Sequence, residues 1–113
     1  MSEFILVITT VPDKETAERI ARTLVEERLA ACVSCSSSCQ SSYWWQGKIV
    51  KDQESMLFIK TLSTRYPELE EKLVAVHPYD VPEVIAIPLA MGYGRYLDWV
   101  REETNPEKKE VSK

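Results

Sequence analysis

The sequence contains few of the residues from which many catalytic and cofactor sites are built. It has one histidine, three glycines and three cysteines among 113 residues. No glycine-rich loop that could cradle a phosphate group can be found in it. No nucleophile lies beside a base in a recognisable pattern, and the glycine and arginine signature of an acylphosphatase is missing. We therefore expect a protein that is not an enzyme and has no obligatory cofactor.

Positive charge and long apolar runs are also scarce. The 14 lysines and arginines are outnumbered by 18 aspartates and glutamates, so no basic stripe is available for a nucleic-acid backbone. No segment approaches the roughly 18 apolar residues of a membrane span, and residues 1–15 lack the features of a signal peptide. An odd number of cysteines fits a reducing compartment. These patterns predict a cytoplasmic protein that binds neither nucleic acid nor membrane.

Hydrophobic periodicity divides the chain into alternating strands and helices. Its length is that of one domain, which we assign to residues 1–104, followed by a charged tail at 105–113. Apolar runs predict strands, and apolar residues at helical spacing predict helices. The expected elements are a strand at 4–8, a helix at 13–31, a strand from 33 that reverses at 46–47 and continues to 50, a strand at 55–61, a helix from 63 or 64, a strand at 83–90 and a helix at 93–104.

This order is βαββαβ with an added C-terminal helix. It predicts an α+β fold, the ferredoxin-like sandwich of one antiparallel sheet with two helices on one face. Three of the strands carry apolar residues at consecutive positions, "FILVI", "MLFI" and "VIAI", so both faces of the sheet require burial. Two helices cannot cover two faces. We therefore expect further copies of the chain to cover the second face.

Three cysteines lie close together in "ACVSCSSSCQSSYWWQGK". Thiolates are preferred ligands of zinc, Cu(I) and iron–sulfur clusters, so a metal site or a redox site has to be considered. In a regular strand, Cys35 and Cys39 would share a face about 13 Å apart, and Cys32 would point the opposite way. One ion could not reach all three. The spacing favours cysteines that act as small, semi-apolar fillers.

Two further segments concentrate aromatic and polar side chains. Trp44 and Trp45 are adjacent, so a strand would present one ring on each face, as at an interface or a pocket wall. In "HPYDVPE", Pro78 and Pro82 stiffen the connection that carries His77, the only imidazole in the chain. A lone histidine is either a structural hydrogen-bonding group or a ligand, and the pattern leaves both open.

Several uncommon motifs agree in order and spacing with one known family. "RLAAC", "YWWQGKIVKDQE", "FIKT", "HPYDVPEVIAIP" and "YLDWV" together resemble the CutA family, also called divalent-cation tolerance proteins, over nearly the whole chain. The resemblance implies a homotrimer with a fold like that of the PII signalling proteins, and a link to copper and other divalent metals. The apolar strands indicate an oligomer independently, but they do not indicate the number three.

The resemblance also implies candidate site residues. Copper binding in some members has been attributed to a cysteine near the end of the first strand and to histidines in the "HP" segment. Thr9 and Val76 stand at two of these positions, so only His77 carries over as a ligand for Cu(II) or another divalent cation. Glu83 or a carboxylate of a neighbouring subunit could complete such a site. The alternative is a PII-like regulatory module with a small ligand in clefts between subunits, lined by Trp44, Trp45, Lys60, His77, Tyr79 and Glu83.

Overall fold

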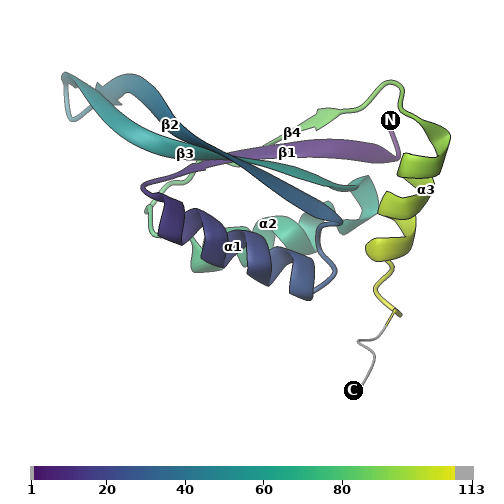
Figure 1. The fold of residues 1–113 in the computed structure, drawn as a ribbon. Coiled ribbons are helices and arrows are strands. Elements are labelled where there is room, and N and C mark those ends of the chain that lie inside the picture. The colour runs from purple at the N-terminus through teal and green to yellow at the C-terminus, as the bar shows by residue number, and fades with distance from the viewer. Residues whose placement is uncertain (1, 109–113) are drawn as a thin grey trace.

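A computed structural model describes residues 2–108 of the chain (Figure 1). Its elements follow the expected order: β1 (Phe4–Val11), α1 (Lys14–Glu26), β2 (Cys32–Trp45), β3 (Lys48–Leu62), the 3₁₀ turn η1 (Ser63–Arg65), α2 (Tyr66–Val76), β4 (Ile85–Pro88) and α3 (Gly94–Glu103). The described residues form one antiparallel sheet in the order β2-β3-β1-β4, with α1 and α2 on one face. The predicted ferredoxin-like plan is confirmed.

Helix α1 is shorter than predicted. Asp13 caps its start by accepting a hydrogen bond from the backbone N–H of Thr16 at 2.8 Å, as its residue type predicts. The apolar period continues to Ala31, but the helix ends at Glu26 and Arg28 adopts a left-handed conformation with φ of 60°. Leu29 and Ala30 still bury their side chains. The apolar period therefore indicates which side chains are buried, and this burial continues after the backbone has left the helix.

Strands β2 and β3 form one long hairpin that turns at Gln46 and Gly47, as predicted. The segments expected as two separate strands, up to Val50 and from Ser55, are continuous in β3. Strand β1 pairs with β3 only as far as Val11 and Ser55. Residues 39–54 of the hairpin therefore project beyond β1 as a two-stranded ribbon, which we call the arm (Figure 1).

The main core lies between the sheet and the helices α1 and α2. Every second residue of the central strands faces these helices. Val7, Leu57 and Ile59 are examples, and their side chains are fully buried. They pack with Ile20 and Leu24 of α1 and with Leu69 and Leu73 of α2. This single face accounts for most of the buried apolar side chains.

The opposite face of the sheet is only partly covered. Helix α3 packs over one end, where Phe4, Ala31 and Val100 form a second small core. The rest carries six large apolar side chains, which we call the open face. They are half-buried or exposed and comprise Leu6, Ile8, Met56, Phe58, Ile85 and Ile87. Ile85 and Ile87 are 49% and 43% exposed, so a single chain leaves apolar surface in water.

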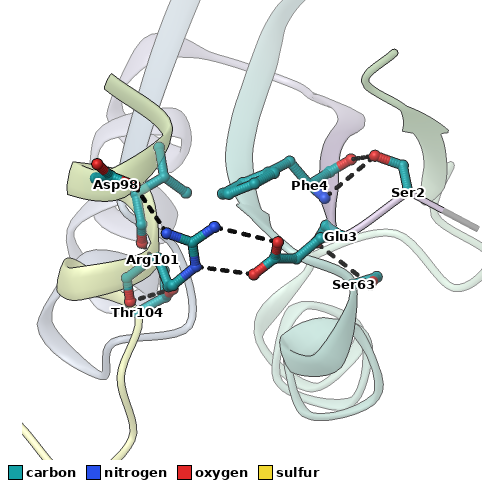
Figure 2. A network of polar contacts seen from close by, with 8 residues as sticks. Ser2, Glu3, Phe4, Ser63, Asp98, Arg101 and Thr104 are labelled. Atoms are coloured by element: carbon teal, nitrogen blue, oxygen red, sulfur yellow. Dashed lines mark hydrogen bonds and ion pairs between the residues drawn. The ribbon is translucent and has the colours of Figure 1, made fainter. Parts of the chain in front are cut away.

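Arg101 fastens α3 to the start of β1 (Figure 2). Its guanidinium donates two hydrogen bonds to the carboxylate of Glu3, at 2.9 and 3.2 Å, and another to Asp98 at 2.9 Å. It also lies 5.2 Å from the centre of the Phe4 ring. The hydrogen bonds from Arg101 lower the pKa of Glu3. On this helix Leu97 and Val100 pack inward, whereas Tyr96 is 39% exposed and packs beside Trp99.

Lys108 holds the first residues of the predicted tail against α3. Its ammonium lies 3.1 Å from a carboxylate oxygen of Glu103, on the last turn of that helix. The remainder of the predicted tail, 109–113, lies outside the described residues.

One buried hydroxyl in the main core yields a stability prediction. Thr9 is fully buried, and its Oγ1 has no hydrogen-bond partner within residues 2–108. Replacing Thr9 by valine should raise the free energy of unfolding by about 1 kcal/mol, because an unsatisfied polar group is removed with little change of shape. Thr61 provides a matched control, since its buried hydroxyl donates to the carbonyl of Leu29 at 2.7 Å. In chemical denaturation, Thr61→Val should destabilise the protein, and a destabilised Thr9→Val would contradict this account.

Candidate functional site

The predicted "HP" segment begins where α2 ends. His77 is the C-terminal cap of that helix and has an extended backbone, and Pro78 and Pro82 restrict the connection that leads to β4. This connection lies beside the end of β1, because the His77 ring contacts the backbone of Thr10. The segment therefore brings the only imidazole to the place where the arm leaves the sheet.

Both ring nitrogens of His77 are engaged. Nδ1 accepts a hydrogen bond from the backbone N–H of Tyr79 at 3.1 Å, so the ring proton resides on Nε2. Nε2 donates it to the carbonyl oxygen of Thr10 at 2.9 Å. The residue is only 8% exposed. Burial lowers the pKa of His77 below its ordinary value, and the imidazole is therefore neutral at neutral pH.

Tyr79 connects this imidazole to the arm. Its ring centre lies 4.9 Å from that of His77. Its hydroxyl donates to a carboxylate oxygen of Glu54 at 2.6 Å, and Glu54 is buried with 7% of its surface exposed. Burial, followed by the Glu54 carboxylate, raises the pKa of Tyr79 well above its usual value. The phenol is therefore a stable hydrogen-bond donor across the physiological range.

Sequence reasoning did not identify Glu54. It lies in the polar stretch "KDQES", whose composition suggests an exposed strand, and no local pattern indicates that a tyrosine 25 residues later will reach it. A second pair of the same kind lies within the arm, where the Tyr43 hydroxyl donates to the carboxylate of Asp52 and the pKa of Tyr43 is raised. The Tyr79–Glu54 pair therefore depends on a tertiary contact, whereas Tyr43 and Asp52 meet across the two strands of the hairpin.

Within the described residues, no hydrogen bond or ring contact joins the other predicted residues to His77. Trp44 and Trp45 are 71% and 58% exposed on the arm. Lys60 lies on the same sheet face as Leu6, and its ammonium donates to the hydroxyl of Ser34 at 2.8 Å. Glu83 is exposed before β4. His77 and Tyr79 are therefore the two predicted residues that the fold brings into direct contact.

The cysteines are arranged differently from the regular strand expected above. A bulge between Ser36 and Cys39, with Ser38 at φ of 64°, inserts one extra residue in β2. Cys35 opposite Leu57 faces the helix side, whereas Cys39 opposite Glu54 is shifted to the face that carries Cys32. The expectation that Cys35 and Cys39 share a face is therefore wrong. Cys35 is also exposed, so it does not fill a core within this chain.

The structure indicates no metal cluster at these thiols. Within residues 2–108, no group of three or more histidine, cysteine, aspartate or glutamate side chains is placed to hold an ion. The three cysteines are free thiols. Shallow hollows occur between α3 and η1 and between α1 and α2, and the residues that line them include none of the predicted site residues. No helix in the described part of the chain is long and apolar enough to cross a membrane.

We predict that the cysteines are dispensable for metal binding. Replacing Cys35 and Cys39 together by valine should leave the metal content of the purified protein and its sedimentation unchanged, because the bulge places the two thiols on opposite faces. Elemental analysis of the variant and the unmodified protein provides the comparison. A metal that is lost from the variant would assign it to these thiols.

Comparisons with known proteins support the family suggested by the motifs. The family described as CutA1 divalent ion tolerance protein matches residues 5–103. The divalent-cation tolerance protein CutA of Thermus thermophilus is 52% identical over 99 residues, which cover 88% of this chain and 96% of that protein. The chloroplastic protein CutA 1 of Oryza sativa is 45% identical over 100 residues, and this chain spans only 56% of its length.

Solved structures agree with this assignment. The crystal structure of CutA from Xylella fastidiosa superposes with a TM-score of 0.90 at 43% identity, covering 92% of this chain and all of that one. The agreement covers both the sequence of residues 5–103 and most of the backbone. The chain therefore belongs to the CutA family of divalent ion tolerance proteins.

Proposed function

We propose that the chain forms a homotrimer that acts in divalent metal-ion tolerance, without catalysis, and that it binds Cu(II) weakly. The observation that carries the assembly is the open face, whose six apolar side chains stay half-buried or exposed within residues 2–108 of a single chain. Buried apolar surface contributes about 25 cal/mol per Å², so association of these faces is favourable. The number three rests on the resemblance to the family.

His77 is the imidazole that we propose for Cu(II). A neutral imidazole is a good ligand for this ion, which leads the divalent series in affinity. Burial keeps the ring neutral, but a metal ion that takes the lone pair of Nδ1 must displace the N–H of Tyr79. This competition gives a physical reason for weak binding. Glu83 or a carboxylate of a neighbouring subunit would supply a further ligand.

A thermal-shift screen tests the metal part of this proposal. The protein should gain thermal stability with Cu(II) more than with Zn(II), Ni(II), Co(II) or Mn(II), because a ligand that binds only the folded state raises the melting temperature. Equal, small shifts for all ions would indicate nonspecific binding and would contradict a copper site.

A second candidate function is a PII-like regulatory module with a small ligand between subunits. The exposed indoles of Trp44 and Trp45 favour it, because large rings with N–H donors are common in pocket walls. The ammonium of Lys60, whose hydrogen bond goes to a neutral hydroxyl, could pair with an anionic group there. Tyr79 and Glu83 complete the proposed lining. In the same screen, a shift with a nucleotide or metabolite and none with Cu(II) would favour this module.

We further propose a cytoplasmic location, with no obligatory cofactor and no nucleic-acid or membrane partner. The formal charge of −4 and the odd number of cysteines support this proposal. Immunofluorescence or fractionation of the source cells would test the location directly.

A further inference from the structure

Strand β3 carries two charged side chains on the same side of the sheet as the open face. Alternate residues of the strand form a row there, in the order Glu54, Met56, Phe58 and Lys60. The two inner residues of the row are apolar, and the two outer ones carry charges of opposite sign. If further copies of the chain cover this face, both charges lose water and each requires a counter-charge.

Glu54 is the anionic end of this row. It is buried, with 7% of its surface exposed, and the neutral Tyr79 hydroxyl donates to its Oε2 at 2.6 Å. Its Oε1 accepts no hydrogen bond within residues 2–108. This oxygen is nevertheless open to solvent, because Thr9 Oγ1 is the one fully buried side-chain oxygen of the described chain that lacks a partner. A donor from outside the chain can therefore reach Oε1 of Glu54.

Lys60 is the cationic end of the row. Its side chain is half-buried, and its ammonium donates to the hydroxyl of Ser34 at 2.8 Å. Its register partners are Leu6 on β1 and Cys32 on β2, so the sheet places no carboxylate directly opposite it. An ammonium has three N–H donors, and within residues 2–108 a neutral hydroxyl is the partner of one of them. The positive charge of Lys60 is therefore available to a carboxylate outside the chain.

These two charges cannot pair within one chain. Six residues separate them along β3, which corresponds to about 20 Å at about 3.4 Å per residue. Three such rows arranged head to tail in a closed ring would bring the Lys60 end of each chain to the Glu54 end of the next. A closed ring repeats the same contact at every interface, so no charge is left without a partner.

We infer that Lys60 of one chain forms an ion pair with Glu54 of the next, and that this pair selects the head-to-tail arrangement of the copies. The inference rests on the proposed homotrimer and adds the residues that join its subunits. Apolar rows attract each other in either direction, because burial of apolar surface has no preferred direction. A reversed row would place like charges together, so the ion pair contributes specificity more than net attraction.

Subunit exchange between unlabelled and isotope-labelled protein, followed by native mass spectrometry, tests the ion pair. Lys60→Met keeps a long unbranched side chain but leaves Glu54 of the next chain without a counter-charge. Exchange should therefore be at least about tenfold faster than in the unmodified protein. If Lys60 were an unpaired charge in an apolar contact, methionine would instead slow the exchange or leave it unchanged, and that result would overturn the inference.

Glu54→Gln completes a double-mutant cycle. Its amide oxygen can still accept the hydrogen bond from Tyr79, so circular dichroism should show an unchanged fold. Alone, the variant should also exchange at least about tenfold faster, but it should add little to Lys60→Met, because the ion pair is already broken. Since the two positions are about 20 Å apart within a chain, coupling between them reports a contact between chains. Additive effects would overturn the pairing. Should Glu54→Gln not fold, the direction of the Lys60→Met effect still decides the inference.

Asp52→Asn is the matched control. It also changes a carboxylate that accepts a tyrosine hydroxyl into an amide, two residues further along the same strand. It should leave subunit exchange unchanged and show no coupling to Lys60→Met.

The native mass spectrum of the unmodified protein distinguishes this inference from the proposed homotrimer. An assembly of three chains without coupling between Lys60 and Glu54 would keep the homotrimer and overturn the ion pair. A spectrum of single chains would overturn both.

Discussion

Phe58→Asp should convert the proposed assembly into single chains of 13.0 kDa. Phe58 lies near the centre of the open face, between Ile8 on β1 and Ser34 on β2. Burying a carboxylate in an apolar interface without a partner costs several kcal/mol, and the substitution occurs in every subunit. Since each 1.4 kcal/mol is a tenfold change in affinity, assembly at micromolar concentration should be lost.

Controls show whether a variant has lost its assembly or its fold. The main core is on the other face of the sheet, so the variant should retain its circular dichroism spectrum and a cooperative unfolding transition. Phe58→Leu preserves an apolar side chain and should sediment like the unmodified protein. Ile87→Asp, on the exposed edge strand β4, provides a second variant in case Phe58→Asp does not fold. An assembly that survives both substitutions would show that another surface holds the subunits together.

His77→Ala should abolish specific Cu(II) binding. It removes the only imidazole of the chain, and isolated carboxylates bind this ion weakly. His77→Gln is the matched control for structure, because its amide can still donate to the Thr10 carbonyl while offering no imidazole nitrogen. Both variants should lose the calorimetric signal of copper binding, and His77→Gln should be the more stable of the two. Unchanged affinity in either variant would place the copper site elsewhere.

The pH dependence of copper binding follows from the same geometry. Burial lowers the pKa of His77 from its ordinary value of 6.5, so the ring stays neutral at pH values where an exposed histidine begins to protonate. Copper affinity should therefore remain constant down to a more acidic pH than for an exposed imidazole, and then fall.

The lowered pKa of His77 also affects the stability of the fold, because the unfolded state binds the proton more readily than the folded state. The stability contributed by neutral His77 is present above pH 6.5 and is lost as the pH falls through the pKa of the folded state. Calorimetry and denaturation between about pH 7.5 and 4.5 would follow both effects.

Local signals predicted much of this fold. Asp13 before an apolar period predicted a capped helix, and Gln46 and Gly47 between β-favouring residues predicted the hairpin turn. Consecutive apolar residues such as Leu6 and Val7 predicted a sheet with two apolar faces, and the structure places them on opposite faces. Each of these signals depends on residues close together in the chain.

Tertiary features were harder to predict. The bulge after Ser36 reversed the face assigned to Cys39, because a strand period cannot reveal one inserted residue within a run of small polar side chains. The end of α1 at Glu26 was also missed, since Leu29 and Ala30 remain buried after the backbone has turned. For the site, the sequence identified His77 and Tyr79 but not the buried Glu54, whose partner lies 25 residues away.

Sedimentation velocity of the unmodified protein at micromolar concentration tests the central claim most directly. The open face should be covered by two further copies of the chain, so a single boundary with a mass near three times 13.0 kDa is the expected result. That mass should persist in the presence of excess chelator, because the proposed contacts between open faces are apolar and would need no metal. A boundary at the mass of one chain would contradict the proposed homotrimer and leave the apolar side chains of the open face unexplained.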